Sequence, residues 1–341
     1  MWSHFKQEKK AMLSLLFLIL LLILSIGNTF LYDGEIRRVS LLFDEGAQVQ
    51  APPFAPSLEF PFGTDRKGYD LLHLIIEGAK WTIGASVLIT LLRIISGLFI
   101  GILIGRMPHK LFKFIESFFD SFTVVPMTMI AYFLLMNVLV FANGTVPDPF
   151  YQRVAFEIII LTLLAVPTLA FYMSNEIRLI LSEEYVTASR ILGGSKKHIL
   201  RKHVSVHMIP VVMILFMQQF VQVLVILVHL GVLNVFFGGT IVFFQGDVDS
   251  VTHEWTGLLG LYYQSIMGHP WIPLVPIIFF TLTIISSNFI LVGIERAYEK
   301  EKVKFKSLPK NSEFPMETMK NKSKEKRFTF ISSKYSKDKP I

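Results

Sequence analysis

Six long runs of apolar residues, separated by polar segments, are the main feature of this 341-residue chain. They lie at residues 11–31, 82–105, 114–141, 155–175, 208–232 and 272–294. A helix of about 20 apolar residues crosses the hydrocarbon core of a bilayer, and each run meets or approaches that length. The pattern predicts an all-α membrane protein with six transmembrane helices. Pro126 and Pro167 fall inside the third and fourth runs, where we expect them to kink the helices.

The first run also resembles the apolar centre of a cleaved signal peptide, because three lysines precede it. Signal peptides end in a small-x-small cleavage site. That pattern is missing around residues 25–30, and the apolar run continues to Leu31. We therefore expect this segment to be retained as the first helix.

The polar segments divide the chain into four parts. These are the N-terminal end with the first helix (1–31), a long outer segment (32–80), a core with helices two to six (81–297) and a tail rich in lysine and serine (298–341). Four prolines favour extended backbone in the middle of the outer segment, but helical spacing of apolar residues returns at 70–80. We expect the tail to be disordered, either as a solvated end or lying on anionic lipid headgroups.

Two loops of the core are long, 178–207 and 233–271. The second contains GGTIVFFQG at 238–246, an apolar run that is too short to span a bilayer. The pattern leaves open whether this run is a strand, an interfacial segment or a re-entrant piece.

Composition and charge support a membrane protein and indicate its orientation. Charged residues make up 17% of the chain, against about 25% in a typical soluble domain. With six helices, 26 of the lysines and arginines fall on the side of the two termini and only six on the other. Cytoplasmic loops carry the excess of basic residues, so we expect a multi-pass protein of the cell membrane with both termini in the cytoplasm. The net charge of +7 is therefore no sign of nucleic-acid binding.

The chain has no apparent chemistry of its own. It lacks the GxxxxGK[ST] loop that cradles ATP phosphates, and we find no catalytic carboxylate pair or Ser/His/Asp set, so we predict that it is not an enzyme. Cysteine is absent, which excludes disulfides and thiolate ligands. His198, His203 and His207 mix two helix faces, so we expect solvated positions and no metal site.

Several polar residues lie inside the apolar runs, where they are expensive and call for an explanation. Arg93 either contacts substrate in a translocation pathway or is a structural residue bonded to a carbonyl or an acidic side chain of a partner subunit. On the fifth helix, Gln218, Gln222 and His229 share a polar stripe with His207, which either lines a pathway or bonds neighbouring helices.

Two further sets of residues in the membrane helices have predicted roles. Asn288, in the last helix, is another pathway candidate. Gly97, Gly101 and Gly105 form a small-xxx-small ridge that predicts close helix packing.

The loop between helices four and five reads EEYVTASRILGGSKKHILRKH (183–203). Good helix formers up to Leu192 precede two glycines, which break helices. Ser195 can then cap a second helix. The sequence predicts an elbow of two short helices that faces a cytoplasmic partner.

This loop resembles the signature of ATP-binding-cassette (ABC) import permeases, Glu-Ala-Ala-x3-Gly-x9-Ile-x-Leu-Pro, in the form found in the peptide/nickel family. The matching residues are Glu184, Tyr185, Val186, Ala188, Arg190, Leu192 and Gly193. The Glu-Ala-Ala triplet is Thr-Ala-Ser here, and the usual Leu-Pro at the end is replaced. Two other segments resemble the same family in the same order: PFGTDRKGYDLLHLIIEGAK (61–80), and EWTGLL (254–259) with the last helix (269–297).

The resemblance implies the C-type permease of a type I importer, with a cytoplasmic coupling helix between helices four and five. Such a permease pairs with a second, homologous permease to form the pore, usually for oligopeptides or dipeptides. Two cytoplasmic ATPase subunits, which bind the ATP and magnesium, and an external binding protein or lipoprotein complete the importer. The resemblance makes the following residues candidates for ATPase coupling: Glu184, Tyr185, Ala188, Ser189, Arg190, Gly193, Gly194 and Ser195.

Three alternatives remain open at this point. The cargo could be nickel or a metal chelate, as in part of the family. A self-sufficient secondary carrier is a second alternative, although carriers usually show internal repeats and mid-membrane carboxylates. A non-transporting membrane scaffold derived from a permease is the third, and the altered loop motif is its support.

Overall fold

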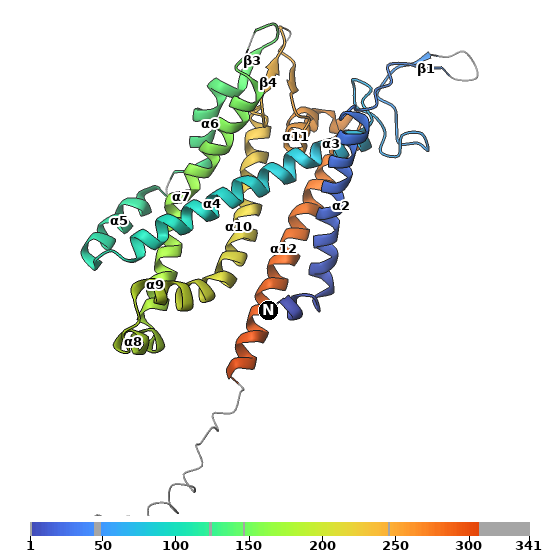
Figure 1. Cartoon of the computed structure of the whole chain (residues 1–341). Coiled ribbons are helices and arrows are strands. Elements are labelled where there is room, and N and C mark those ends of the chain that lie inside the picture. Colours follow the sequence, from blue (N-terminus) through green and yellow to red (C-terminus); the bar gives the residue numbers. More distant parts are fainter. Residues whose placement is uncertain (1, 44–48, 123–124, 146, 245, 307–341) are drawn as a thin grey trace, which may run out of the picture. The chain divides into compact units, whose positions relative to one another are not determined.

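The computed structural model describes residues 2–43, 49–122, 125–145, 147–244 and 246–306 (Figure 1). The chain consists of two units, Met1–Tyr298 and Glu299–Ile341. All elements described below belong to the first unit, apart from the end of the last helix. Most of the predicted tail, residues 307–341, lies outside the described residues.

Five helical stretches within the described residues are long and apolar enough to cross a membrane. They are α2 (Lys9–Tyr32), the stretch Leu71–Gly105, α7 (Phe150–Ser182), the stretch Lys196–Val232 and Trp271–Lys302 within α12 (Trp271–Lys306). The structure therefore supports a multi-pass membrane protein. A short helix, α1 (Trp2–Phe5), precedes α2.

The third predicted membrane helix, 114–141, is wrong as a single helix. The structure has α5 (His109–Phe122) and α6 (Met127–Leu139) there instead. Pro126 directly precedes α6, so it does not kink a continuous helix as predicted. Proline is well suited to a helix start, since the first backbone N–H groups have no helical partner. At 13 residues, α6 is apolar but shorter than the five candidate spans. Pro167 does lie inside α7.

The second membrane stretch begins at Leu71, well before the predicted residue 82. It runs through α3 (Leu71–Ala79), a π-helical turn η1 (Lys80–Gly84) and α4 (Ala85–Gly105) without a break. The Asp70 side chain caps its start by accepting a hydrogen bond from the Leu72 N–H at 2.9 Å. The helical spacing seen at 70–80 thus belongs to the same rod as the apolar run that follows.

The chain between α7 and the last helix contains the remaining helical elements. These are α8 (Glu184–Ile191), α9 (Lys196–Ile199), η2 (Leu200–Val204), α10 (Ser205–Val232), α11 (Trp255–Tyr262) and a 3-10 turn, η3 (Tyr263–Met267).

Small sheets correct the prediction of an all-helical chain. The run 238–246 contains β4 (Thr240–Val242), so of the three alternatives the strand is right. It pairs in parallel with β3 (Val140–Ala142) and antiparallel with β5 (Val248–Ser250). In a separate two-stranded sheet within residues 32–80, β1 (Leu42–Phe43) pairs antiparallel with β2 (Val49–Gln50). Helices still make up most of the described chain.

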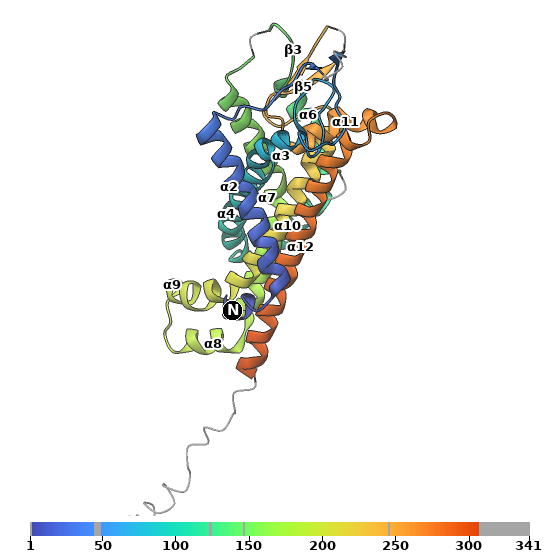
Figure 2. The same cartoon turned by 90° about the vertical axis from the view of Figure 1, so that its right-hand side faces the viewer.

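The first helix packs into the bundle along much of its length. Its Ser25 hydroxyl donates to the Glu77 carbonyl of α3 at 3.2 Å and accepts from the Lys80 N–H at 3.1 Å. Near the start of α2, Ala11 lies against Gly293 of α12, so α2 and α12 run side by side (Figures 1 and 2). These contacts are those of a structural helix of the bundle.

Candidate functional site

The elbow between α7 and α10 is the first candidate site. Val186 anchors α8 by its fully buried side chain, whereas Ile191 and Leu192 at the tip are 81% and 87% exposed. Gly193 has a φ of +86°, a conformation that glycine adopts without strain. The Ser195 hydroxyl accepts from the His198 N–H at 3.2 Å and caps α9. The sequence features that predicted the turn are thus the ones that form it.

All eight residues predicted for coupling lie on this elbow. Most of them are exposed, and Ser189 and Gly194 are half-buried. Tyr185 packs its ring at 5.6 Å from His203 and 5.5 Å from His207, which ties α8 to the helix leading into α10. Burial and the nearby Glu183 carboxylate raise the pKa of Tyr185. The exposed tip therefore rests on a packed base, as a contact surface for another protein requires.

The predicted polar stripe on α10 forms one exposed face. Gln218, Gln222 and His229 are all exposed on the described unit. Asn288 is also exposed but lies on a different helix, α12. Exposed amides inside an apolar span need water or a further protein surface, because lipid cannot hydrogen-bond them.

Arg93 makes its hydrogen bonds within this chain. Its side chain is fully buried in α4. Its Nε and Nη2 donate to the Leu161 carbonyl of α7 at 2.9 and 2.6 Å, and its Nη1 donates to Gln219 at 3.2 Å. The guanidinium thus bridges α4, α7 and α10, with partners in its own chain where the sequence suggested a partner subunit.

The glycine ridge faces α7. A Cβ added at Gly97 would lie 3.0 Å from the Leu169 side chain, and one at Gly101 would lie 2.9 Å from the Ala170 carbonyl. At Gly105 the nearest atom would be the Ser174 carbonyl, at 3.2 Å. The backbones of α4 and α7 therefore approach each other closely along this ridge.

The opposite end of the unit holds a polar cluster that sequence reasoning missed. Asp65 is buried and accepts hydrogen bonds from the Lys67 and Tyr69 N–H groups and from the Tyr262 hydroxyl, the last at 2.8 Å. Burial raises the pKa of Asp65, and burial together with Asp65 raises the pKa of Tyr262. These residues border a cavity of about 470 Å³ that His253 also lines.

The loop after α10 is held by buried groups of the chain. Glu254 accepts from the Gly257 N–H at 2.8 Å and caps α11. From α7, Glu157 accepts from the Gly238 N–H at 2.9 Å, and Arg153 donates to the Gly238 carbonyl at 3.1 Å. Glu157 and Glu254 are thus positioning residues for the backbone of this loop. The EWTG run at the start of α11 was a sequence signal for Glu254.

Trp255, at the start of α11, connects this loop to the second membrane stretch. Its indole N–H donates to the Ile75 carbonyl of α3 at 2.9 Å, and its backbone N–H donates to the Thr82 hydroxyl at 2.9 Å. The ring is completely buried. The start of α11 therefore packs against α3 and η1.

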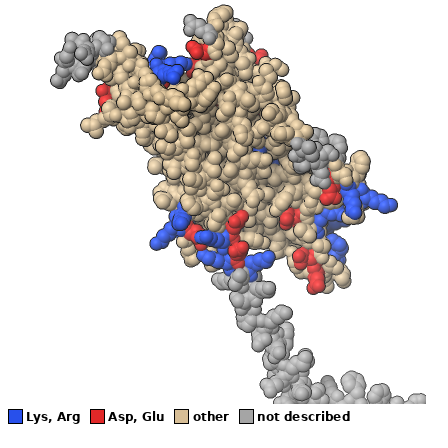
Figure 3. Space-filling view, turned by 180° about the vertical axis from the view of Figure 1, so that it is seen from behind, with Lys and Arg blue, Asp and Glu red and all other residues tan. Residues whose placement is uncertain are grey.

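Charged side chains gather at the two ends of the face shown in Figure 3, and a broad zone between them is largely without charge. Such a zone is what the hydrocarbon core of a bilayer requires of a protein surface.

Comparisons with known proteins identify relatives over most of the chain. Residues 97–303 match the family described as "binding-protein-dependent transport system inner membrane component". The peptide transport system permease protein SapC of Haemophilus influenzae is 25% identical over 305 residues, which cover 87% of this chain and 94% of that protein. The glutathione transport system permease protein GsiD of Escherichia coli O1:K1 is 21% identical over 303 residues, 87% of this chain and 88% of that protein.

Proposed function

The chain belongs to the family of inner membrane components of binding-protein-dependent transport systems, and from that premise we propose that this ABC importer permease subunit forms half of a pore for peptides. The two relatives named above are permeases for peptides and for glutathione, itself a small peptide. The family assignment does not favour the metal-chelate permease, the secondary carrier or the scaffold.

The observation that carries the coupling proposal is the exposed apolar tip of the elbow. Ile191 and Leu192 follow α8 directly and are almost fully exposed, although the base of the elbow is packed. Burying one such side chain in a partner contributes about 1.5–3 kcal/mol. We propose that α8 and this tip dock on a cytoplasmic ATPase subunit, which binds the ATP and magnesium that the chain itself has no motif to hold.

A topology with six crossings is supported by two contacts. Gly105, at the end of α4, borders the same cavity as Lys196, where the stretch leading to α10 begins. Val140, directly after α6, pairs with Thr240, beyond the other end of α10. The chain from 105 to 140 therefore travels the length of α10, which is about 42 Å for its 28 residues. We propose that α5 and α6 together form the remaining crossing.

Six crossings place both termini on one side, and the excess of Lys and Arg makes that side the cytoplasm. The start of α2 and the elbow lie at the same end of the unit in both views (Figures 1 and 2). The polar cluster around Asp65 then faces outward, toward an external binding protein. The exposed stripe of Gln218, Gln222 and His229 is proposed to face the pathway and the second permease subunit, with Asn288 as a further candidate.

The coupling proposal is tested with the double variant Ile191→Ser, Leu192→Ser in the assembled transporter. We expect ATPase association to weaken on the order of a hundredfold, because two apolar side chains lose their burial, and ATP-driven peptide uptake to fall with it. The control is Leu58→Ser, Phe244→Ser, which changes two apolar residues that are at least as exposed and lie in the segments assigned to the outer side. ATPase co-purification and uptake into vesicles are measured. Unchanged association in the elbow variant would refute the docking surface.

A further inference from the structure

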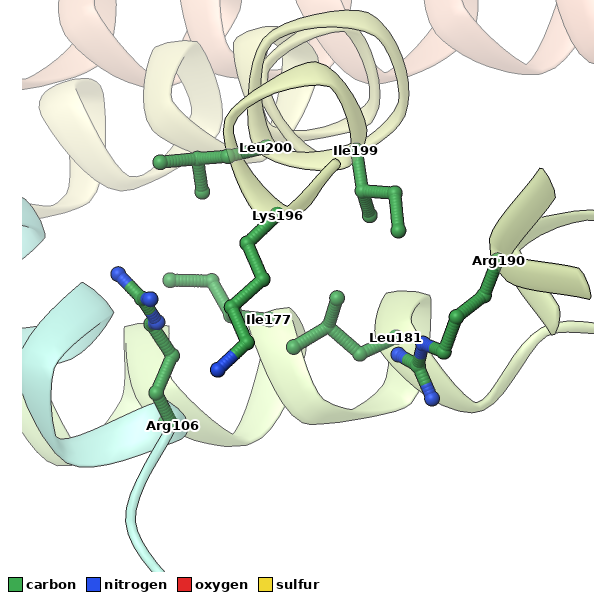
Figure 4. Close-up of a pocket in the computed structure, with 8 residues that line it drawn as sticks. Arg106, Ile177, Leu181, Arg190, Lys196, Ile199 and Leu200 are labelled. Carbon is green, nitrogen blue, oxygen red and sulfur yellow. The ribbon is translucent and has the colours of Figure 1, made fainter. Parts of the chain in front are cut away.

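A basic cavity lies between the elbow and the ends of the membrane helices. Its volume is about 280 Å³. Three cationic side chains line it: Arg106 after α4, Arg190 of α8 and Lys196 of α9. In Figure 4, Lys196 extends across the space between Arg106 and Leu181, and the Arg190 guanidinium points toward Leu181. None of the described residues that line the cavity is acidic.

The three cations have no protein counter-ion within the part of the chain that the structure describes. Neither an ion pair with a carboxylate nor a side-chain hydrogen bond involves Arg106, Arg190 or Lys196 there. Elsewhere in the unit cations are engaged: Lys67, for example, pairs with Asp249 at 2.7 Å. Like charges that line one cavity without a counter-ion repel one another, so an anion in the cavity would relieve the repulsion.

The rest of the lining is apolar. Ile177, Leu181, Ile199 and Leu200 form the floor and walls around the cations (Figure 4). A free phosphate ion has no apolar part to place against these side chains. An esterified phosphate with a glycerol backbone and acyl chains offers both the anion and the apolar surface.

The cavity also lies at the level where lipid headgroups occur. Three candidate membrane stretches have one end beside it. Leu71–Gly105 ends at Gly105, Phe150–Ser182 ends directly after Leu181, and Lys196–Val232 begins at Lys196. Basic pockets between membrane helices on the cytoplasmic side are suited to anionic headgroups.

We propose that this cavity binds the headgroup of an anionic phospholipid. The phosphate lies between Arg106, Arg190 and Lys196, and the glycerol and upper acyl chains lie against Leu181 and Leu200. Because Arg190 and Lys196 belong to the elbow and Arg106 follows α4, one headgroup joins the elbow to the membrane helices. The lipid therefore restrains α8 and α9 relative to α4 and α7. This site does not depend on the identity of the partner that docks on the elbow.

The test uses the full-length chain in neutral detergent. Phosphatidylglycerol, phosphatidylcholine or inorganic phosphate is titrated in, the melting temperature is followed, and bound lipid is counted by native mass spectrometry. The Arg106→Gln, Arg190→Gln, Lys196→Gln variant removes the cations. The control, Lys110→Gln, Lys113→Gln, Lys202→Gln, removes three exposed cations that do not line the cavity. A third variant, Arg106→Lys, Arg190→Lys, Lys196→Arg, keeps the charge.

Each cation near anionic lipid contributes about a fivefold gain in affinity, so the cavity variant is expected to bind phosphatidylglycerol about 100-fold more weakly. The control and charge-keeping variants should bind it nearly as the parent does. The single variant Arg106→Gln changes a position outside the elbow and should bind phosphatidylglycerol about fivefold more weakly. It keeps the test valid if the triple variant misfolds.

Three results would overturn the proposal. Equal losses in the cavity and control variants would mean general surface attraction. If phosphatidylcholine stabilised the chain as much as phosphatidylglycerol does, the charge of the headgroup would play no part in binding. Inorganic phosphate could also raise the melting temperature as much as the lipid does, in a way that depends on the same three cations. That result would assign the cavity to a free anion.

Discussion

The close approach of α4 and α7 at Gly101 leads to a sharp prediction for Gly101→Ala. The added Cβ would lie 2.9 Å from the Ala170 carbonyl oxygen and 3.0 Å from the Met173 Cβ. Both neighbours are at or next to the backbone of α7, so they cannot move aside as the end of a flexible side chain could. The two helices must separate by a few tenths of an ångström or tilt.

The loss of stability caused by the added Cβ is isolated by comparison with a matched control. Gly84→Ala makes the same chemical change in the same continuous helical stretch, and its Cβ would meet nothing within 4 Å. Both variants gain the advantage of alanine over glycine in a helix, about 1 kcal/mol in water. The difference between them therefore isolates the cost of overpacking, about 1–3 kcal/mol. Gly97→Ala should cost less than Gly101→Ala, because it meets the end of the Leu169 side chain.

The assay is unfolding of the full-length chain in detergent micelles, with both alanine variants and the parent compared in one detergent. We expect Gly101→Ala to melt below the parent and Gly84→Ala to melt at or above it. Equal stability of the two variants would show that α4 and α7 do not pack through this glycine, and the reasoning from the ridge would fail.

Two other predictions concern buried polar groups. Arg93→Lys should destabilise the chain by about 1.5–3 kcal/mol, since an ammonium cannot reproduce the guanidinium bridge to Leu161 and Gln219. The same change at exposed Arg106 should leave the stability nearly unchanged. Equal losses of stability at both positions would contradict the bridge. Burial lowers the pKa of His253, so the folded chain favours the neutral imidazole. The chain therefore keeps its full stability above the usual histidine pKa of about 6.5. As the pH falls from there toward the lowered pKa of the folded state, the free energy of unfolding drops by at most about 1.4 kcal/mol per pH unit. His253→Asn, which tolerates the local φ of 50°, should remove that loss in melting curves from pH 8 to 5, and an unchanged pH dependence would contradict the assignment.

Local signals in the sequence predicted the elbow well. The turn at Gly193 and the cap at Ser195 depend on neighbours only a few residues away, and the structure forms both as expected. The same holds for the helical character of 70–80, where Asp70 caps α3. The role of the elbow in ATPase coupling stays a prediction.

Long-range partners were beyond the sequence. The pairing of β3 with β4 joins residues 140–142 to 240–242, and nothing local distinguishes such a strand from an interfacial segment. Arg93 was recognised as costly in the membrane, but its acceptor, the Leu161 carbonyl, is a backbone group that no composition reveals. The break before Pro126 was missed because the apolar run continues on both sides of the proline.

The uninterrupted rod Leu71–Gly105 has a mechanical consequence. Its 35 residues measure about 52 Å, well beyond the roughly 30 Å of hydrocarbon in a bilayer, so it must lean or project into the water. One tip is clamped by Trp255 and the other borders the basic cavity at Gly105. Because α7 packs against this rod from Gly97 to Gly105, the two helices can swing only together, as one lever: each degree of swing about the clamped tip carries the far tip by about 0.9 Å. A swing of a few degrees at the clamped tip thereby becomes a displacement of several ångströms at the other tip.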